Sequence, residues 1–583
     1  MTTLPLGRLL ALLLPIACVG LFARVYYTPD EPREASMVVA MASQTHRALP
    51  TLAGRPFAEK PPLLYWLGGG AVAALGAAPA VARLPNLAYQ LLAALALGTL
   101  AARAAGPAAG FAAGFAAVTM LQLYQVLVWL ATDAPLVAGV ALALCGAYVG
   151  LVSHERRPRL GGYLAMHAGL AIAFFAKGFA GWLVPALAFV TVIALERRWR
   201  ELARAELWAG APLLVLAIGA WVWAVAATAG GAPLKVLFWY NLVGRAVALD
   251  APAQYAYASG HANSPAKYLL ELPLYLLPWT VLAVAALRRA RRGLRLAGDT
   301  GTAWRLALGA IGPPTVLLSF AATARGVYYA PAALGFALLL GLYVGCAGAA
   351  GDRFDRLAWR LTGATIALLA VILGVLAVLL AWAPAARVLA DVATGCLALG
   401  AAAAAVYLAL TPRLATAAAL PRFALATALV LSLVLLPVYL RLNGWLSLEA
   451  TATRIEAAAG DAPLVLFDSD ETTVALAELY LPAARLQAII DRGQPDAPGR
   501  GRQALAGGAR LLWLVPDHGR WSVADWLGYL GYRPGQAPAP PAPTLPAELG
   551  ALRLECLVVR PGGRAYAVLA ADGAARATGA ACT

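Results

Sequence analysis

The stretch YYTPDEPREASMVVAMASQTHRALPTLAGRPFAEKPPLLYW, residues 26–66, sets the organisation of the whole chain. It places Asp30, Glu31 and Arg33 near its start and an acid beside a base, Glu59 and Lys60, near its end, with apolar segments on both sides. Ionisable groups beside a bilayer are costly and tend to mark functional sites. We therefore expect the rest of the chain to hold this loop in place.

The composition indicates a polytopic membrane protein. The 583-residue chain is 61% hydrophobic and 13% charged, whereas soluble proteins are about half apolar. The formal net charge is +16, but the arginines group in short runs between apolar segments, as the positive-inside rule predicts for cytoplasmic loops. This distribution argues against a nucleic-acid partner.

Four arginine-rich runs orient the spans, at 156–159, 197–204, 288–295 and 353–360. If they face the cytoplasm, the apolar segment 134–153 must enter it, which leaves Asp133 outside with the opening stretch. If residues 63–79 crossed the membrane, Asp133 and the opening stretch would lie on opposite faces. This short segment includes three consecutive glycines, and we interpret it as a helix along the outer surface. About thirteen spans result, and the chain after residue 442 lies outside.

The same topology gathers the isolated charges on one face of the membrane. The count rests on the arginine runs and on the limited length and glycines of segment 63–79, and the convergence of the other charges on one face supports it. The residues and the loop that converge are Asp30, Glu59, Lys60, Asp133, Lys177, loop 230–267 and Arg325.

Within the opening loop we expect a helix from about Glu31 to Thr45. Pro32 then falls in the first turn, where its missing N–H costs nothing. The helix buries an apolar face and leaves Asp30 near its entry, where a negative charge is favoured. The residues expected on the buried face are Val38, Met41 and Ala42.

After residue 442 the pattern changes to that of a small α/β domain. We expect buried strands at 462–467, 509–515 and 552–559 and helices at 471–481 and 522–530. The chain is therefore divided into a membrane domain, 1–442, whose first periplasmic loop is 26–83, and a periplasmic α/β domain, 443–583.

The other charged residues each have an ordinary structural explanation when taken alone. Asp133 in WLATDAPL is placed to cap a helix, Lys177 in FFAKGFAG to snorkel to the interface, and Arg325 to anchor there. His261 reads as a loop histidine. Together, however, cations and carboxylates at a membrane surface suit transfer from a lipid-linked phosphate. The cations stabilise the leaving phosphate, and a carboxylate orients or deprotonates the acceptor.

Several motifs resemble those of the bacterial glycosyltransferases of the C superfamily (GT-C), and among them the lipid A 4-amino-4-deoxy-L-arabinose transferases and their protein-mannosyltransferase-like relatives. The motifs are TPDEPREA at 28–35, EKPPLLYW at 59–66, TDAPL at 132–136, AKG at 176–178, PWT at 278–280 and S-x5-R-x2-Y-Y-x-P at 319–331. The resemblance implies a GT-C fold with about thirteen transmembrane helices, periplasmic juxtamembrane helices and a C-terminal soluble domain.

The resemblance also implies roles for individual residues. The catalytic residues are Asp30, as the essential acid, with Arg33 and Asp133 in support. The residues that hold the donor phosphate are Lys60, Lys177, Arg245 and Arg325. The substrate pocket takes Glu31, Phe57, Tyr328 and Tyr329. A divalent metal, zinc, is implied at Glu59 and His261, although two ligands alone make a weak site.

Two positions depart from the family pattern. Ala324 stands where the family has a lysine, with Arg325 beside it, and Phe57 stands where relatives often carry a tyrosine. Both bear on the sugar and the acceptor rather than on the type of reaction.

We expect an inverting, inner-membrane glycosyltransferase with its active site on the periplasmic face. Its partners are an undecaprenyl-phosphate-linked sugar, expected to be 4-amino-4-deoxy-L-arabinose, a lipid A phosphate as acceptor, and the bilayer. An alternative within the class is transfer to protein or another envelope glycan. Outside the class, a lipid or sugar transporter requires broken helices at mid-membrane and an internal repeat, and the sequence shows neither.

Overall fold

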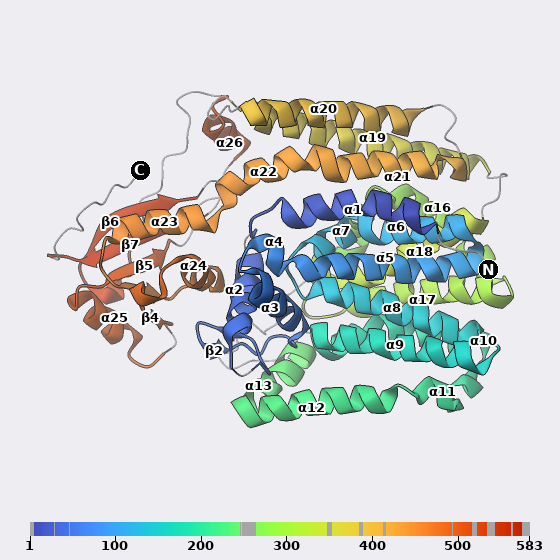
Figure 1. Ribbon diagram of the computed structural model, residues 1–583, viewed down its shortest axis with the longest axis horizontal. Helices are drawn as coiled ribbons and strands as arrows, with labels where there is room; N and C mark the ends of the chain where they lie inside the picture. The colour runs from blue at the N-terminus through green and yellow to red at the C-terminus, as the bar shows by residue number, and fades with distance from the viewer. Residues whose placement is uncertain are drawn as a thin grey trace.

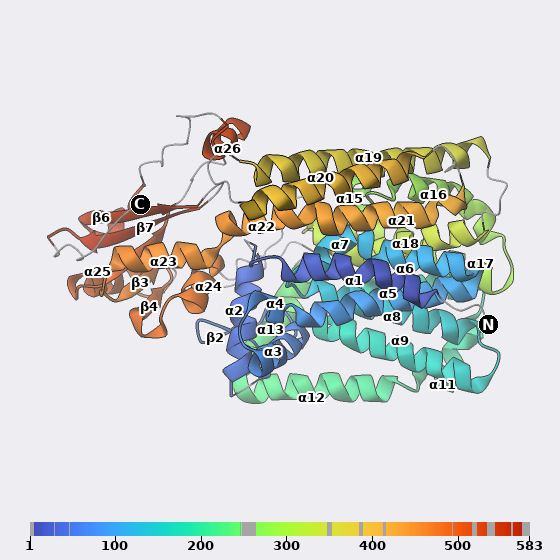
Figure 2. The ribbon, with the colours of Figure 1, turned by 45° about the horizontal axis from the view of Figure 1, so that its top comes forward.

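The computed structural model describes residues 5–27, 30–45, 47–244, 247, 264–346, 352–383, 389–411, 416–492, 494–515, 522–532, 543–560 and 564–573. A long helical bundle carries a small sheet domain at one end, and a group of short elements lies between the two (Figures 1 and 2).

Long helices that run roughly side by side form the bundle (Figure 1). Its first half contains α1 (Leu6–Phe22), α5 (Leu84–Ala105), α6 (Pro107–Thr119), α7 (Leu121–Val128), α8 (Asp133–Val152), α9 (Arg156–Lys177), α10 (Leu183–Glu196), α11 (Ala205–Trp208), α12 (Ala211–Ala229) and α13 (Ala232–Lys235). Its second half contains α15 (Lys267–Tyr275), α16 (Thr280–Leu294), α17 (Gly298–Ser319), α18 (Ala330–Cys346), α19 (Arg353–Ala381), α20 (Leu389–Leu410), α21 (Leu420–Leu429) and α22 (Leu435–Leu446).

In the described part of the chain, eight helices are long and apolar enough to cross a membrane, or up to ten if each bent pair is one span. The chain is therefore a multi-span membrane protein, as predicted. The count of thirteen spans stays a prediction.

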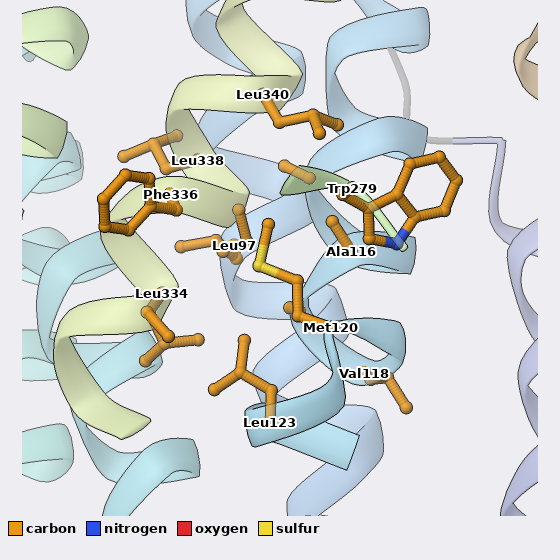
Figure 3. Packing of buried hydrophobic residues seen from close by; sticks show 14 of the residues in the cluster. Leu97, Ala116, Val118, Met120, Leu123, Trp279, Leu334, Phe336, Leu338 and Leu340 are labelled. Atoms are coloured by element: carbon orange, nitrogen blue, oxygen red, sulfur yellow. The ribbon is translucent and has the colours of Figure 1, made fainter. Parts of the chain in front are cut away.

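The bundle core is apolar and consists mainly of alanines and leucines, with a few large aromatic side chains among them. Figure 3 shows Trp279 and Met120 packed among leucines and alanines of neighbouring helices. Met120 lies at the 61° bend between α6 and α7, and the indole of Trp279 donates to Thr119 Oγ1 across 3.0 Å. The bend redirects α7 and so places the residues that lead into Asp133.

A stripe of small residues brings α8 and α9 together as an antiparallel hairpin. A Cβ atom added to Gly146 would lie 2.6 Å from the Gly162 carbonyl oxygen, and one added to Gly139 would lie 2.8 Å from that of Gly169. Such close approach of backbones is the usual use of small residues between membrane helices. The hairpin sets the first residue of α8, Asp133, beside the last residue of α9, Lys177.

The arginine runs meet at the end of the bundle opposite Asp133. Arg198 Nη2 donates to the Leu151 carbonyl at 2.6 Å, Arg305 pairs with Glu196 at 3.1 Å, and Arg288 pairs with Asp352 at 2.7 Å. These bonds tie the loops near 151–159, 196–204, 288–305 and 352–356 into one region. The predicted separation of the arginine runs from Asp133 is confirmed.

The short elements at the other end are α2 (Asp30–Ser43), β1 (Thr51–Leu52), β2 (Arg55–Pro56), α3 (Leu63–Leu75) and α4 (Pro79–Ala82). The helix predicted for 31–45 is confirmed, with Val38 and Met41 buried and Ala42 half-buried. A Cβ atom at Gly68 or Gly69 would lie 3.0 Å from Val38 or Met41, so these glycines let α3 press on α2. At 13 residues, α3 is shorter than a span.

The C-terminal residues form a mixed sheet of order β4-β3-β5-β7-β6. Its strands are β3 (Leu464–Phe467), β4 (Leu486–Ile490), β5 (Arg510–Leu514), β6 (Leu552–Val559) and β7 (Ala565–Ala571), and its helices are α23 (Leu448–Ala459), α24 (Glu471–Tyr480), α25 (Ala497–Ala506) and α26 (Val523–Tyr529). Strand β3 pairs in parallel with β4 and β5, whereas β7 is antiparallel to β5 and β6.

The three predicted strands and two predicted helices are all present, within two residues at each end. Strands β4 and β7 were not predicted. Strand β7 reads AYAVLAA, and alanine is depleted in strands, so its sequence carries little β signal. The predicted boundary at residue 442 lies inside α22 and stays a prediction.

Candidate active site

Glu31 anchors the first turn of α2. Its side chain is fully buried and accepts from Arg83 Nε and Nη2, both at 3.0 Å, and from Arg24 Nη2 at 3.3 Å. The backbone N–H groups of Tyr27 and Leu130 complete the set at 2.7 and 2.9 Å. These bonds join the chain after α1, the start of α5 and the turn before Asp133 to one carboxylate, so they fix where α2 begins.

Asp30 is the exposed acid at this site. Its side chain is 40% exposed, and one oxygen lies 3.7 Å from Arg33 Nη2, one helical turn away. The carboxylate therefore faces solvent while a buried guanidinium stands beside it.

Arg33 is surrounded by carboxylates. Its Nη2 contacts Glu34 at 2.8 Å, and its Nη1 lies 2.5 Å from Glu471 and 3.7 Å from Glu59. Burial opposes the guanidinium charge, but the three glutamates outweigh it and hold the pKa of Arg33 well above its ordinary value. The Phe57 ring lies 5.6 Å from the guanidinium carbon.

Lys60 is tied to Glu34. Its ammonium donates to Glu34 Oε1 at 2.8 Å and lies 3.9 Å from Glu59, while the Tyr65 hydroxyl donates to Glu34 Oε2 at 2.6 Å. Burial raises the pKa of Glu34, but the charges of Lys60 and Arg33 outweigh it and hold that pKa below its ordinary value. Both partners are thus charged at neutral pH, and a phosphate at Lys60 would share the ammonium with Glu34.

Asp133 and Lys177 form a second charged group at the same end of the bundle. Lys177 Nζ donates to Asp133 Oδ1 at 2.5 Å and lies 4.9 Å from the centre of the Tyr328 ring. Lys177 ends α9 because Gly178 follows with a φ of +65°, a conformation that glycine adopts at no steric cost. The Leu130–Glu31 bond links this group to α2.

The remaining predicted residues lie close to Tyr328. Arg325 is exposed and directly precedes the short helical turn Gly326–Tyr329, and its carbonyl accepts from the Tyr268 hydroxyl at 3.1 Å. Tyr329 is buried, stacks on Tyr268 with ring centres 5.3 Å apart, and bonds Thr315 at 2.7 Å. Tyr329 therefore supports the turn that presents Tyr328 and Arg325.

Two predicted site residues, Arg245 and His261, lie outside the described residues. In the parts of the chain that are described, no group of three His, Cys, Asp or Glu side chains is placed to hold a metal. Glu59, the other predicted metal ligand, lies within 4 Å of two cations, Arg33 and Lys60. Because His261 lies outside the described residues, the divalent metal at Glu59 and His261 stays a prediction, and no chemical step is derived from one.

The structure adds residues that the sequence did not single out. Glu34 sits at the centre of the α2 cluster, Arg24 and Arg83 hold Glu31, and Glu471 arrives from the C-terminal sheet domain. Glu34 lies one helical turn from Asp30 and Glu31, so its place in DEPREA was a usable signal. The two groups together offer an exposed carboxylate beside several cations, which suits binding and activation of phosphate-bearing substrates.

Comparisons with known proteins agree with this architecture. The family model described as dolichyl-phosphate-mannose-protein mannosyltransferase matches residues 59–223. The crystal structure of ArnT from Cupriavidus metallidurans bound to undecaprenyl phosphate superposes with a TM-score of 0.71 at 18% identity, covering 98% of both chains. The chain has the fold of this ArnT. The apo structure of the same ArnT gives a TM-score of 0.68 at 16% identity, covering 97% of both chains.

Two curated relatives are similar in sequence, and both are named undecaprenyl phosphate-alpha-4-amino-4-deoxy-L-arabinose arabinosyl transferase. The protein from Edwardsiella ictaluri is 26% identical over 335 residues, 56% of this chain and 57% of the relative. The protein from Pseudomonas aeruginosa is 28% identical over 337 residues, 56% of each. The chain thus spans a little over half the length of these relatives. The resemblance predicted from TPDEPREA and EKPPLLYW is confirmed.

Proposed function

We propose that the protein is an inverting glycosyltransferase that moves a sugar, 4-amino-4-deoxy-L-arabinose, from undecaprenyl phosphate to a lipid A phosphate. The observation that carries the proposal is the exposed Asp30 carboxylate beside Arg33, at the same end of an ArnT-like fold as Lys60 and Lys177. The names of the similar curated proteins supply the sugar and the carrier.

In this reaction an acceptor oxygen attacks the anomeric carbon from the face opposite the carrier phosphate. The bond from that carbon to the carrier oxygen breaks, its electron pair leaves with the phosphate, and the configuration inverts. Lys60, Lys177 and Arg325 stabilise the negative charge on the leaving phosphate. A phosphate acceptor is already ionised, so Asp30 orients the reactants rather than acting as a strong base.

We place the active site and the C-terminal domain on the periplasmic side of the bacterial inner membrane. The arginine runs at the opposite end of the bundle support this orientation through the positive-inside rule. Cys556 of the C-terminal sheet is disulfide-bonded, and disulfides persist in oxidising compartments such as the periplasm.

Mass spectra of lipid A test the proposal. Cells that express the chain should add aminopentose to lipid A, whereas cells without the gene, or with Asp30→Asn, should not. Unmodified lipid A in expressing cells would reject lipid A as the acceptor.

Transfer of the sugar to protein is the second candidate, because the matched family model describes protein mannosyltransferases. Glycopeptide analysis of the same cells separates the two. Sugar on envelope proteins with unchanged lipid A would favour this second candidate.

A further inference from the structure

The C-terminal sheet domain reaches the candidate active site through the first residue of α24. Asp470 caps this helix by accepting from the Thr473 backbone N–H at 3.0 Å, and it pairs with Arg564 at 2.6 Å. Glu471 follows the cap, where the positive end of the helix dipole favours a carboxylate. The domain thus holds Glu471 in place independently of the bundle.

Helix α24 packs against α2, and Figure 1 shows the two helices next to each other between the bundle and the sheet domain. Arg33 pairs with Glu471, and one turn further along α2 the Ser36 hydroxyl donates to Glu478, which lies two turns further along α24. Leu479 and Tyr480 pack against the apolar cluster formed by α2 and α3. Because both polar pairs and an apolar contact share one register, the approach of Glu471 to Arg33 is set by the docking of two helices.

The ion pair with Glu471 orients one arm of the Arg33 guanidinium. One arm, Nη2, faces Glu34 at 2.8 Å and Asp30 at 3.7 Å. The other arm, Nη1, faces Glu471 at 2.5 Å, while Glu59 is more distant at 3.7 Å. Without Glu471, Glu59 is the next carboxylate at Nη1, and rotation toward it moves Nη2 relative to Asp30.

We propose that Glu471 is a positioning residue for the transfer reaction, and that the C-terminal domain completes the active site by supplying it. Glu471 fixes Arg33, and Arg33 fixes the Asp30 carboxylate. The inference rests on the proposed glycosyl transfer and adds to it a requirement for a residue 438 positions away from Arg33 in the sequence.

The test compares two ion pairs that cross the same interface. Glu471→Ala removes the pair with Arg33. Asp491→Ala removes the pair between Asp491 and Arg55 at 2.6 Å, in which both side chains are about half exposed and neither touches Arg33. Glu471 is itself 41% exposed, and its loss leaves Arg33 with Glu34, so the variant is expected to fold.

Purified full-length proteins are assayed with an undecaprenyl-phosphate sugar and lipid A. Glu471→Ala should lower kcat by about 10- to 100-fold and leave the donor KM within about twofold, since misplacement of a positioned group by about an ångström can cost about 100-fold and Glu34 still holds the other arm of Arg33. Asp491→Ala should keep the wild-type kcat. Glu471→Gln should recover roughly half of the lost activity, because its amide oxygen still accepts from Nη1.

If the wild type transfers sugar, three outcomes would overturn the inference. In the first, Glu471→Ala keeps the wild-type kcat; in the second, kcat falls equally in Glu471→Ala and Asp491→Ala. In the third, Glu471→Ala raises the donor KM and leaves kcat unchanged. A wild type that transfers no sugar rejects the proposed function and this inference with it.

Discussion

Asp30 is the residue on which the proposed chemistry depends. Its carboxylate is exposed, whereas the neighbouring acids Glu31 and Glu34 are buried and engaged with arginine or lysine partners. Of these three acids, only Asp30 has a solvent-exposed carboxylate that a substrate can contact. The predicted place of Glu31 in the substrate pocket gains no support from its contacts, and it stays a prediction.

Asp30→Asn is expected to reduce transfer by about 100-fold or more, since loss of one preorganised electrostatic contact at a reacting centre typically costs about 100- to 1,000-fold. The measurement is sugar transfer to lipid A by purified protein, with expression and thermal unfolding in detergent followed in parallel. Asp299→Asn is the control, because Asp299 is exposed at the opposite end of the bundle. Full activity in Asp30→Asn, or an equal loss in Asp299→Asn, would reject the role of Asp30.

The sequence predicted the site residues that lie close together in the chain, and it missed those that come together only in the folded protein. One loop contains Asp30, Arg33, Glu59 and Lys60, and the helix predicted within it brings them together. Their grouping could therefore be predicted from the local sequence. Arg83 was missed because a single arginine at the end of a span is typical of an interfacial anchor, and nothing local shows that it bonds Glu31 twice. Glu471 was missed because only docking of the C-terminal domain brings it to Arg33.

At the scale of elements, the α8–α9 hairpin sets the distance between Asp133 and Lys177. The sequence predicted the α8 span as the apolar segment 134–153 and placed both charges on one face of the membrane. It did not show that the helices touch through glycine, because glycine is common in membrane helices whether or not they pack closely. The backbone approach at Gly146 and Gly162 is therefore a property of the structure alone.

Neighbouring glycines in α9 give a matched test of this contact. A Cβ atom on Gly162 would lie 2.5 Å from the Gly150 nitrogen, whereas one on Gly161 meets nothing within 4 Å. Gly162→Ala should cost about 1–3 kcal/mol through overpacking and lower transfer. Gly161→Ala should be neutral or stabilising, because alanine favours helix. The measurement is thermal unfolding in detergent, and equal effects of the two variants would contradict the tight contact.

At the scale of the whole molecule, the charges divide between the two ends of the bundle. Arg55 lies near the α2 cluster with its side chain 55% exposed, and Arg156 lies in the first arginine run with 82% exposed. In spheroplasts of a variant without the free cysteines Cys18, Cys145, Cys346 and Cys396, a membrane-impermeant maleimide should label Arg55→Cys at once. Arg156→Cys should react only after the membrane is permeabilised. The reverse pattern would invert the proposed topology.

The last prediction concerns how the C-terminal domain docks on the bundle as pH changes. Burial at the interface raises the pKa of Glu478 above its ordinary value of 4.5, although bonds from Ser36 and the Ala53 backbone oppose the shift. A raised pKa means that the docked state favours the protonated carboxyl. Its contribution to stability is thus present at pH 4 and lost as pH rises through the raised pKa.

Glu478→Gln is neutral at every pH and should therefore unfold at a higher temperature than the wild type at pH 7, by roughly 2 °C, with little difference at pH 4. Glu548→Gln is the control of opposite sign, because a backbone bond and Arg492, at 2.5 Å, lower the pKa of Glu548. That variant should not be stabilised at pH 7. A Glu478→Gln protein less stable than the wild type at pH 7 would show that the charged carboxylate, rather than the protonated one, holds the domain on α2.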